Sequence, residues 1–183
     1  MKDRIAALLL AAGAGLAHTI APAAPAPTAA SGIAVLNEAR ELLRGPAASP
    51  AGWPRAFSLL KIAAEDGNSA AAYYLGLMYR NGMGVARDSN LAAHWLCKAA
   101  QGRVAPAMFL YANMLLTGEG ATRDEAAARR WIEQAAALEH PGAMLQMALA
   151  LRDGSMGFER DETQYEIYMK EAAHALRHQM PEP

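Results

Sequence analysis

Histidines four residues apart near the end of the chain are the first candidates for chemistry. His174 and His178 would lie on one face of a helix, which is the spacing that zinc-binding helices use. The residues between them are Ala-Leu-Arg, so the glutamate of the H-E-x-x-H motif is missing. We interpret the two histidines as a solvated pair near a helix C-terminus, where a positively charged imidazole is favourable.

His94, His140 and Cys97 are the other candidates for catalysis or metal binding. The sequence contains neither a Ser-His-Asp arrangement nor a phosphate-binding loop. Cys97 lies in a segment expected to be helical, where a lone cysteine packs as a small hydrophobic side chain, and Lys98 beside it is weak evidence for thiol activation. We therefore predict that the protein is not an enzyme and has no catalytic residue, no metal site and no cofactor.

The elements that carry these side chains follow a period of 36 residues. The segment that begins at Ala71 recurs at Ala107 and, in a less regular form, from Ala143. Such a period is typical of a solenoid, in which each helical unit buries its apolar face on its neighbours and leaves an extended surface for partners. The equivalent positions, each 36 residues apart, are Gly82, Gly118 and Gly154; Asp88 and Asp124; and Trp95 and Trp131.

Packing and turn formation explain the fixed positions. We expect Gly82 and its equivalents to take positive φ values where the chain leaves the first helix of a repeat. Asp88 and Asp124 precede the second helices and are expected to cap them rather than to catalyse. Gly76, which is alanine in the later repeats, is expected to allow close approach of two helices.

The motifs A-x-x-x-L-G-x-x-Y, G-x-G-V and A-x-x-W, with the aspartate between them, resemble the Sel1-like repeat, a relative of the tetratricopeptide repeat. Residues 69–104 and 105–140 carry the pattern most fully, whereas residues 32–66 and 141–178 are degenerate repeats. The resemblance implies an all-α, right-handed α/α superhelical solenoid whose first helices line a concave groove. It also implies a non-enzymatic adaptor or scaffold that binds other proteins.

The spacing within the first helices predicts which side chains would face such a groove. Positions offset from the Leu-Gly-Tyr seam point away from the second helix and form an apolar row with arginines at its edge, typical of a site for a peptide or helix. The predicted groove residues are Tyr73, Leu77, Arg80, Phe109, Asn113, Leu116, Leu145, Leu149 and Arg152. The alternative is that Tyr73 and Phe109 pack between adjacent repeats as core.

The N-terminal segment has the order of a secretory signal peptide. Lys2 and Arg4 precede an apolar run, and the sequence Ala-Pro-Ala ends at Ala23. We predict a signal peptide over residues 1–23 and a Pro/Ala-rich tether over residues 24–31, and hence a periplasmic or secreted protein. The alternative is an inner-membrane anchor formed by an uncleaved signal.

Composition favours a protein or peptide partner. The 183 residues are 53% hydrophobic, enough for a core, and the net charge of −1 without lysine or arginine runs argues against nucleic-acid binding. We expect a monomer without a membrane span after signal cleavage. Self-association through the last helix is an alternative to ordinary capping of the solenoid, since Tyr165, Ile167, Tyr168 and Met169 lie close together there.

Two further functions stay open at this point. A cysteine-rich branch of the similar family is linked to β-lactams, which keeps a small-ligand or peptidoglycan-related role as an alternative, although its paired cysteines are absent from this chain. The other alternative is a structural component of a secretion or polysaccharide-export complex.

Overall fold

The computed structural model describes residues 29–45 and 48–179. These residues form eight α-helices and one 3₁₀ turn, without a strand, which confirms the predicted all-α class. The predicted signal peptide lies outside the described residues, as does the tether up to residue 28. The helices are α1 (Ala29–Arg44), α2 (Trp53–Glu65), α3 (Ser69–Asn81), α4 (Ser89–Gln101), α5 (Ala105–Thr117), α6 (Glu125–Ala137), α7 (Pro141–Asp153) and α8 (Glu162–Gln179), with the 3₁₀ turn at Pro50–Gly52.

The start of α1 differs from the sequence prediction. The tether was expected to reach Ser31, but α1 begins at Ala29 and takes in its last three residues. No proline follows Pro27 in this segment, and alanine is the residue that costs least in a helix, so the helix extends backwards.

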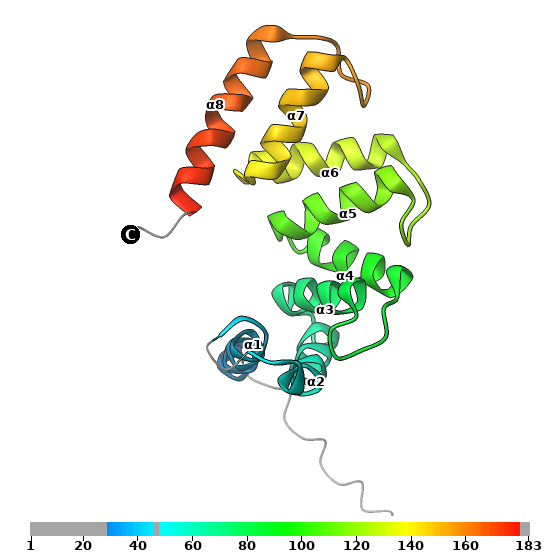
Figure 1. The fold of residues 1–183 in the computed structure, drawn as a ribbon, viewed down its shortest axis with the longest axis vertical. Coiled ribbons are helices and arrows are strands. Elements are labelled where there is room, and N and C mark those ends of the chain that lie inside the picture. Colours follow the sequence, from blue (N-terminus) through cyan, green and yellow to red (C-terminus); the bar gives the residue numbers. More distant parts are fainter. Residues whose placement is uncertain (1–28, 46–47, 180–183) are drawn as a thin grey trace, which may run out of the picture.

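The helices form a curved array of antiparallel pairs (Figure 1). Each pair with more than marginal contact consists of neighbours in sequence, from α1 against α2 to α7 against α8. Contacts confined to neighbours are the defining property of a solenoid, and they place α3, α5 and α7 as the first helices of successive repeats. The predicted solenoid of helix-turn-helix repeats is confirmed.

The turns inside the repeats form as the sequence predicts. Gly82, Gly118 and Gly154 end the first helices with φ values of 70°, 77° and 67°. The carboxylate of Asp88 accepts a hydrogen bond from the Leu91 N–H at 2.9 Å, so the predicted cap is confirmed.

Asp124 has the same role in the next repeat, since its carboxylate accepts from the Ala127 N–H at 2.8 Å. Asp161 caps α8 through the Gln164 N–H at 2.9 Å, although a one-residue insertion shifts its position in the period. The capping acid therefore recurs in all three repeats, and each one satisfies a backbone donor that the helix leaves unpaired.

A second glycine in the turn docks each loop on the preceding repeat. A Cβ atom on Gly84 would lie 2.7 Å from the carbonyl carbon of Trp53, the first residue of α2. A Cβ on Gly120 would lie 1.9 Å from the carbonyl oxygen of Ser89, the first residue of α4. Only glycine permits this approach, which fixes how one repeat sits against the next.

Small residues also set the helix spacing inside a repeat. Gly76 is buried, and a Cβ there would lie 2.8 Å from the Cγ of Leu96 on α4. The side chains of Leu75 and Leu96 are both fully buried in the same cluster. Because Gly76 packs against α4, residues on the other side of α3, such as Tyr73 and Leu77, point away from α4.

Candidate functional site

Nine side chains from α3, α5 and α7 make up the surface that we call the first-helix face. They are Tyr73, Leu77, Arg80, Phe109, Asn113, Leu116, Leu145, Leu149 and Arg152, the residues predicted from the spacing. The three from α7 are exposed, and the six from α3 and α5 are half-buried. None of the nine is fully buried, so each retains some contact with solvent.

The apolar members of this face divide by their packing. Tyr73 and Leu77 contact the first core cluster, and Phe109 and Leu116 contact the second. Leu149, one helical turn beyond Leu145 on α7, is 38% exposed, and Leu145 is 39% exposed. The face therefore changes from half-buried apolar side chains on α3 and α5 to exposed ones on α7.

Tyr73 lies beside the aromatic ring of Tyr74, with the ring centroids 5.3 Å apart and the planes at 61°. Burial raises the pKa of the Tyr73 phenol, and the guanidinium of Arg44 opposes that rise. The phenol is thus neutral at physiological pH, and it offers a polar group within an otherwise apolar row.

Phe109 contacts the following repeat. A Cβ atom on Gly142 would lie 3.1 Å from two of its ring carbons, and its centroid is 4.8 Å from that of His140. The ring thus packs between repeats while staying half-buried, so it has features of both the core and the groove interpretations.

His140 is a helix cap rather than a catalytic or metal-binding group. Its Nδ1 accepts a hydrogen bond from the Ala143 N–H at 3.2 Å at the start of α7. Burial lowers the pKa of the His140 imidazole, which favours the neutral form that this acceptor role requires.

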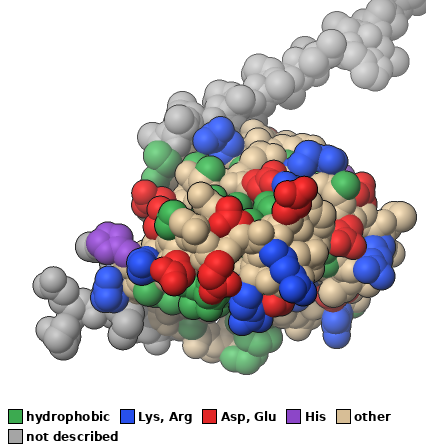
Figure 2. All heavy atoms as spheres, turned by 90° about the horizontal axis from the view of Figure 1, so that it is seen from above, with side chains coloured by type: hydrophobic (Ala, Val, Ile, Leu, Met, Phe, Trp, Pro, Cys, Tyr) green, Lys and Arg blue, Asp and Glu red, His purple; other side chains and the backbone are tan. Residues whose placement is uncertain are grey.

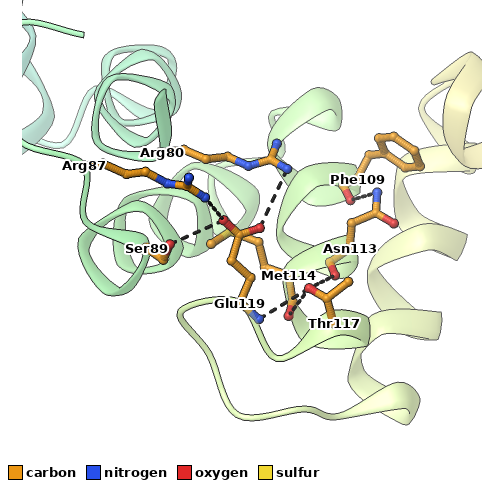
Figure 3. Close-up of polar contacts among 8 residues, drawn as sticks. All are labelled: Arg80, Arg87, Ser89, Phe109, Asn113, Met114, Thr117 and Glu119. Atoms are coloured by element: carbon orange, nitrogen blue, oxygen red, sulfur yellow. Dashed lines mark hydrogen bonds and ion pairs between the residues drawn. The ribbon is translucent and has the colours of Figure 1, made fainter. Parts of the chain in front are cut away.

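Arg80, predicted as a polar anchor, lies in an ionic cluster that joins two repeats (Figure 3). Glu119, in the turn after α5, has one carboxylate oxygen 3.9 Å from Arg80 Nη2 and the other 3.1 Å from Arg87 Nη2. The hydroxyl of Ser89 donates to the Glu119 carboxylate at 3.3 Å. The sequence analysis missed this role of Glu119, because the period marks only the glycines on either side of it.

The other polar groups of the face are also held within the chain. The Arg152 Nε lies 2.8 Å from a carboxylate oxygen of Asp153, and its guanidinium carbon lies 5.9 Å from the Tyr165 ring centroid. Asn113 donates from Nδ2 to the Phe109 carbonyl oxygen at 3.0 Å on its own helix (Figure 3). Both predicted arginine anchors therefore pair with carboxylates of the protein itself.

Cys97 is half-buried, and its sulfur accepts a hydrogen bond from the Gln101 Nε2 at 3.7 Å. Burial and then a hydrogen bond to Cys97 raise the pKa of the Tyr111 phenol to about 12. The Nζ of Lys98 lies 4.7 Å from the Trp95 ring centroid, over its face. The Lys98 ammonium therefore makes a cation–π contact with Trp95.

The described residues could also act through a metal-ligand cluster, a hollow or a membrane-spanning helix. They contain no group of three or more histidine, cysteine, aspartate or glutamate side chains placed to hold a metal ion. A hollow of about 790 Å³ between α6, α7 and α8 has both charged and apolar residues around it, among them Glu139, Met144, Lys170 and Glu171. Across residues 29–45 and 48–179, none of the helices has the length and apolar character needed to span a bilayer.

Comparison with known proteins gives one family and a set of similar structures. The sequence model of the Sel1 repeat matches residues 54–68, 69–103, 105–140 and 141–175. No curated protein matches the chain.

Two solved structures illustrate the similarity. The crystal structure of a Sel1 repeat protein from Oxalobacter formigenes is 28% identical, with a TM-score of 0.68, over 81% of this chain and 59% of that one. The structure of c5321, a protective antigen of uropathogenic Escherichia coli with an SLR fold, is 28% identical, with a TM-score of 0.69, over 78% of this chain and 30% of that one. The chain thus spans less than two thirds of either similar structure.

Proposed function

The chain belongs to the Sel1 repeat family, and from this premise we propose that it is a non-enzymatic adaptor that binds a peptide or helix of a partner protein on its first-helix face. Sel1 repeat proteins generally mediate protein–protein interactions. The choice of this particular face, and of an apolar segment as its ligand, rests on the chain's own side chains.

The exposure of two leucines on α7 is the observation that carries the proposal. Leu145 and Leu149 are 39% and 38% exposed, and they continue the row that Tyr73 and Phe109 begin on α3 and α5. Contiguous exposed apolar area of this kind marks interaction surfaces on soluble proteins. Covering it is favourable by about 25 cal/mol for each Å² of apolar surface removed from water.

The arginines at the edge of the face refine the chemistry of the ligand. Arg80 shares the Glu119 carboxylate with Arg87, and Arg152 pairs with Asp153. Each of these arginines already has a carboxylate partner before any ligand arrives, although Arg80 and Arg87 share one. This supports a ligand whose apolar side chains supply the affinity, with backbone or neutral polar groups at the arginine edge.

We propose that the adaptor acts in the bacterial envelope after export. The basis is the N-terminal sequence alone, in which Lys2 and Arg4 precede an apolar run and a small-residue cleavage motif. Intact-mass analysis of the protein recovered from a periplasmic extract tests this location. A mature protein starting near residue 24 supports it, and a full-length protein in the membrane fraction supports the uncleaved anchor instead.

Selection from a library of random displayed peptides tests the binding proposal. We expect the immobilised chain to enrich amphipathic peptides with apolar residues at helical or alternating spacing. Leu149→Glu should weaken the selected peptides at least about tenfold, because the variant loses apolar contact area and a bound peptide would have to remove a carboxylate from water.

A matched control comes from the second-helix side of the repeat. Leu91 on α4 is 40% exposed, almost the same as Leu149, but lies outside the first-helix face. Leu91→Glu should leave peptide affinity unchanged. Failure to enrich any peptide, or equal losses in the two variants, would remove the proposal.

A further inference from the structure

The outer side of α8 presents positions that the next helix covers in the earlier repeats. On α4, Ala100 is fully buried, and it belongs to the cluster that contains Met108 and Ala112 of α5. On α6, the equivalent Ala136 is 5% exposed, and it belongs to a cluster that contains Ala143 and Met144 of α7. A first helix therefore covers this side of both second helices.

The equivalent side of α8 is uncovered among the residues that the structure describes. Ala173 is exposed, at the position of Ala100 and Ala136 once the one-residue insertion is counted. Leu176, a turn further on, is 51% exposed. We call Glu166, Ala173, Leu176 and Arg177, all of which are exposed, the α8 outer face.

The length of α8 enlarges this face. α8 has 18 residues, whereas α4 and α6 have 13 each. In the earlier repeats the chain turns back where α8 continues, and Leu176 lies on that continuation. The extra turn therefore adds exposed apolar surface rather than capping the fold.

Charge is distributed along α8 in a self-complementary way. Glu162 and Glu166 occupy the first turns, and Lys170 and Arg177 follow towards the C-terminus, with Glu171 as the exception. Seen from above, the surface of the molecule carries both acidic and basic side chains (Figure 2). Glu166 pairs with Lys170 at 3.5 Å, and Arg177 has no ion-pair partner within residues 29–45 and 48–179.

We propose that two copies of this chain associate through the α8 outer face, with α8 of one copy antiparallel to α8 of the other. The second copy's α8 would take the place that α5 takes on α4, where α5 runs antiparallel to α4 (Figure 1). Glu166 and Arg177 lie about three turns apart on one side of the helix. In an antiparallel pair related by a two-fold axis, Glu166 of each copy therefore faces Arg177 of the other.

The charges favour this arrangement over a parallel one, in which like charges would face each other. A single helix pair is at the small end of specific interfaces, which bury about 1,200–2,000 Å². The dimer is therefore a weak one, in equilibrium with the monomer. This association does not depend on the first-helix face, so it stands or falls separately from peptide binding.

Sedimentation velocity of the full chain over a concentration series tests the dimer. We expect a reversible monomer–dimer equilibrium, with Leu176→Glu raising the dissociation constant at least about tenfold. Leu91→Glu, at a leucine of similar exposure on α4, should leave the equilibrium unchanged. Helix content and melting temperature measured on each variant show that the fold is kept.

Charge exchange tests the antiparallel pairing without removing apolar surface. Glu166→Arg alone and Arg177→Glu alone should each weaken the dimer, because they place like charges opposite each other. The double variant should restore it, since the opposite charges meet again with their order reversed. A chain that stays monomeric, assembles beyond dimers, or shows no recovery in the double variant would overturn the proposal.

Discussion

At the scale of single residues, the structure assigns fixed roles to side chains that the sequence offers for chemistry. His140 caps α7 and its ring lies beside that of Phe109, and Cys97 accepts a hydrogen bond from the Gln101 side chain on its own helix. Both roles serve packing or helix termination. The proposed binding surface rests instead on the exposed leucines of α7, which have no reactive group.

His140 makes the stability of the fold depend on pH. Burial lowers its pKa, so the unfolded chain binds a proton more readily than the folded one. Its stabilising contribution is present above the unfolded pKa of about 6.5 and declines as the pH falls below that value. We expect His140→Asn, which keeps a good N-cap, to reduce the loss of stability between about pH 7.5 and about pH 5.

Urea unfolding of both proteins at several pH values measures this effect. The comparison is between slopes of stability against pH, because the variant also loses the ring contact with Phe109. Parallel pH profiles would show that other groups cause the acid sensitivity.

The contrast between Asp88 and His140 shows what the sequence could predict at this scale. Asp88 has an equivalent 36 residues later, so both its position and its residue type indicate a cap. His140 occupies the position of Asn68, which caps α3 through the Ala71 N–H at 2.9 Å. The position is Val104 in the repeat between them, however, and histidine is not a usual capping residue, so its role was harder to predict. Glu119 escapes prediction for a related reason, since its partners lie on the preceding repeat.

At the scale of helices and turns, Gly118 and Gly120 of one loop have different roles. Both take a left-handed backbone conformation, but only Gly120 lies against the preceding repeat. Gly118 has φ 77°, and a Cβ atom there would make only ordinary van der Waals contacts, at 3.9 Å from the Ala121 carbonyl oxygen and the Arg123 Cβ. Gly120 has φ 68°, but a Cβ there would lie 1.9 Å from the Ser89 carbonyl oxygen. The first glycine turns the chain, whereas the second also allows the loop to touch the repeat before it.

The two alanine variants should therefore differ in stability. Gly118→Ala is expected to cost about 1–2 kcal/mol, the strain of a left-handed conformation. Gly120→Ala carries that strain and also forces the loop away from α4, so we expect a further loss of at least about 1 kcal/mol. Urea unfolding measures both free energies, and equal losses would mean that the loop docks without needing this close approach.

The helices themselves were more predictable than the surfaces they form. The turn glycines, the capping aspartates and the tryptophan at position 95 recur at one spacing, and these determine where helices end and how they pair. The period also selects the positions of the first-helix face. It cannot give their exposure, because that depends on how the following repeat packs, as the contrast between half-buried Phe109 and exposed Leu145 shows.

At the scale of the whole molecule, each helix packs mainly on the helices that precede and follow it in sequence. Each repeat therefore holds its neighbours in place and also exposes part of its own surface. α3, α5 and α7 each pack between the preceding second helix and their own, and the side chains that remain uncovered make up the proposed first-helix face. The last second helix, α8, has the outer face that earlier repeats cover. We therefore propose two distinct interaction surfaces, one for a partner segment and one for a second copy.

Hydrogen exchange of the chain with and without a selected peptide tests the central claim most directly. The account predicts that bound peptide slows amide exchange in α3, α5 and α7, most strongly around Leu145 and Leu149, with little change in α4 and α6. Protection concentrated on the second helices or on α8, with none on α7, would contradict binding at the first-helix face.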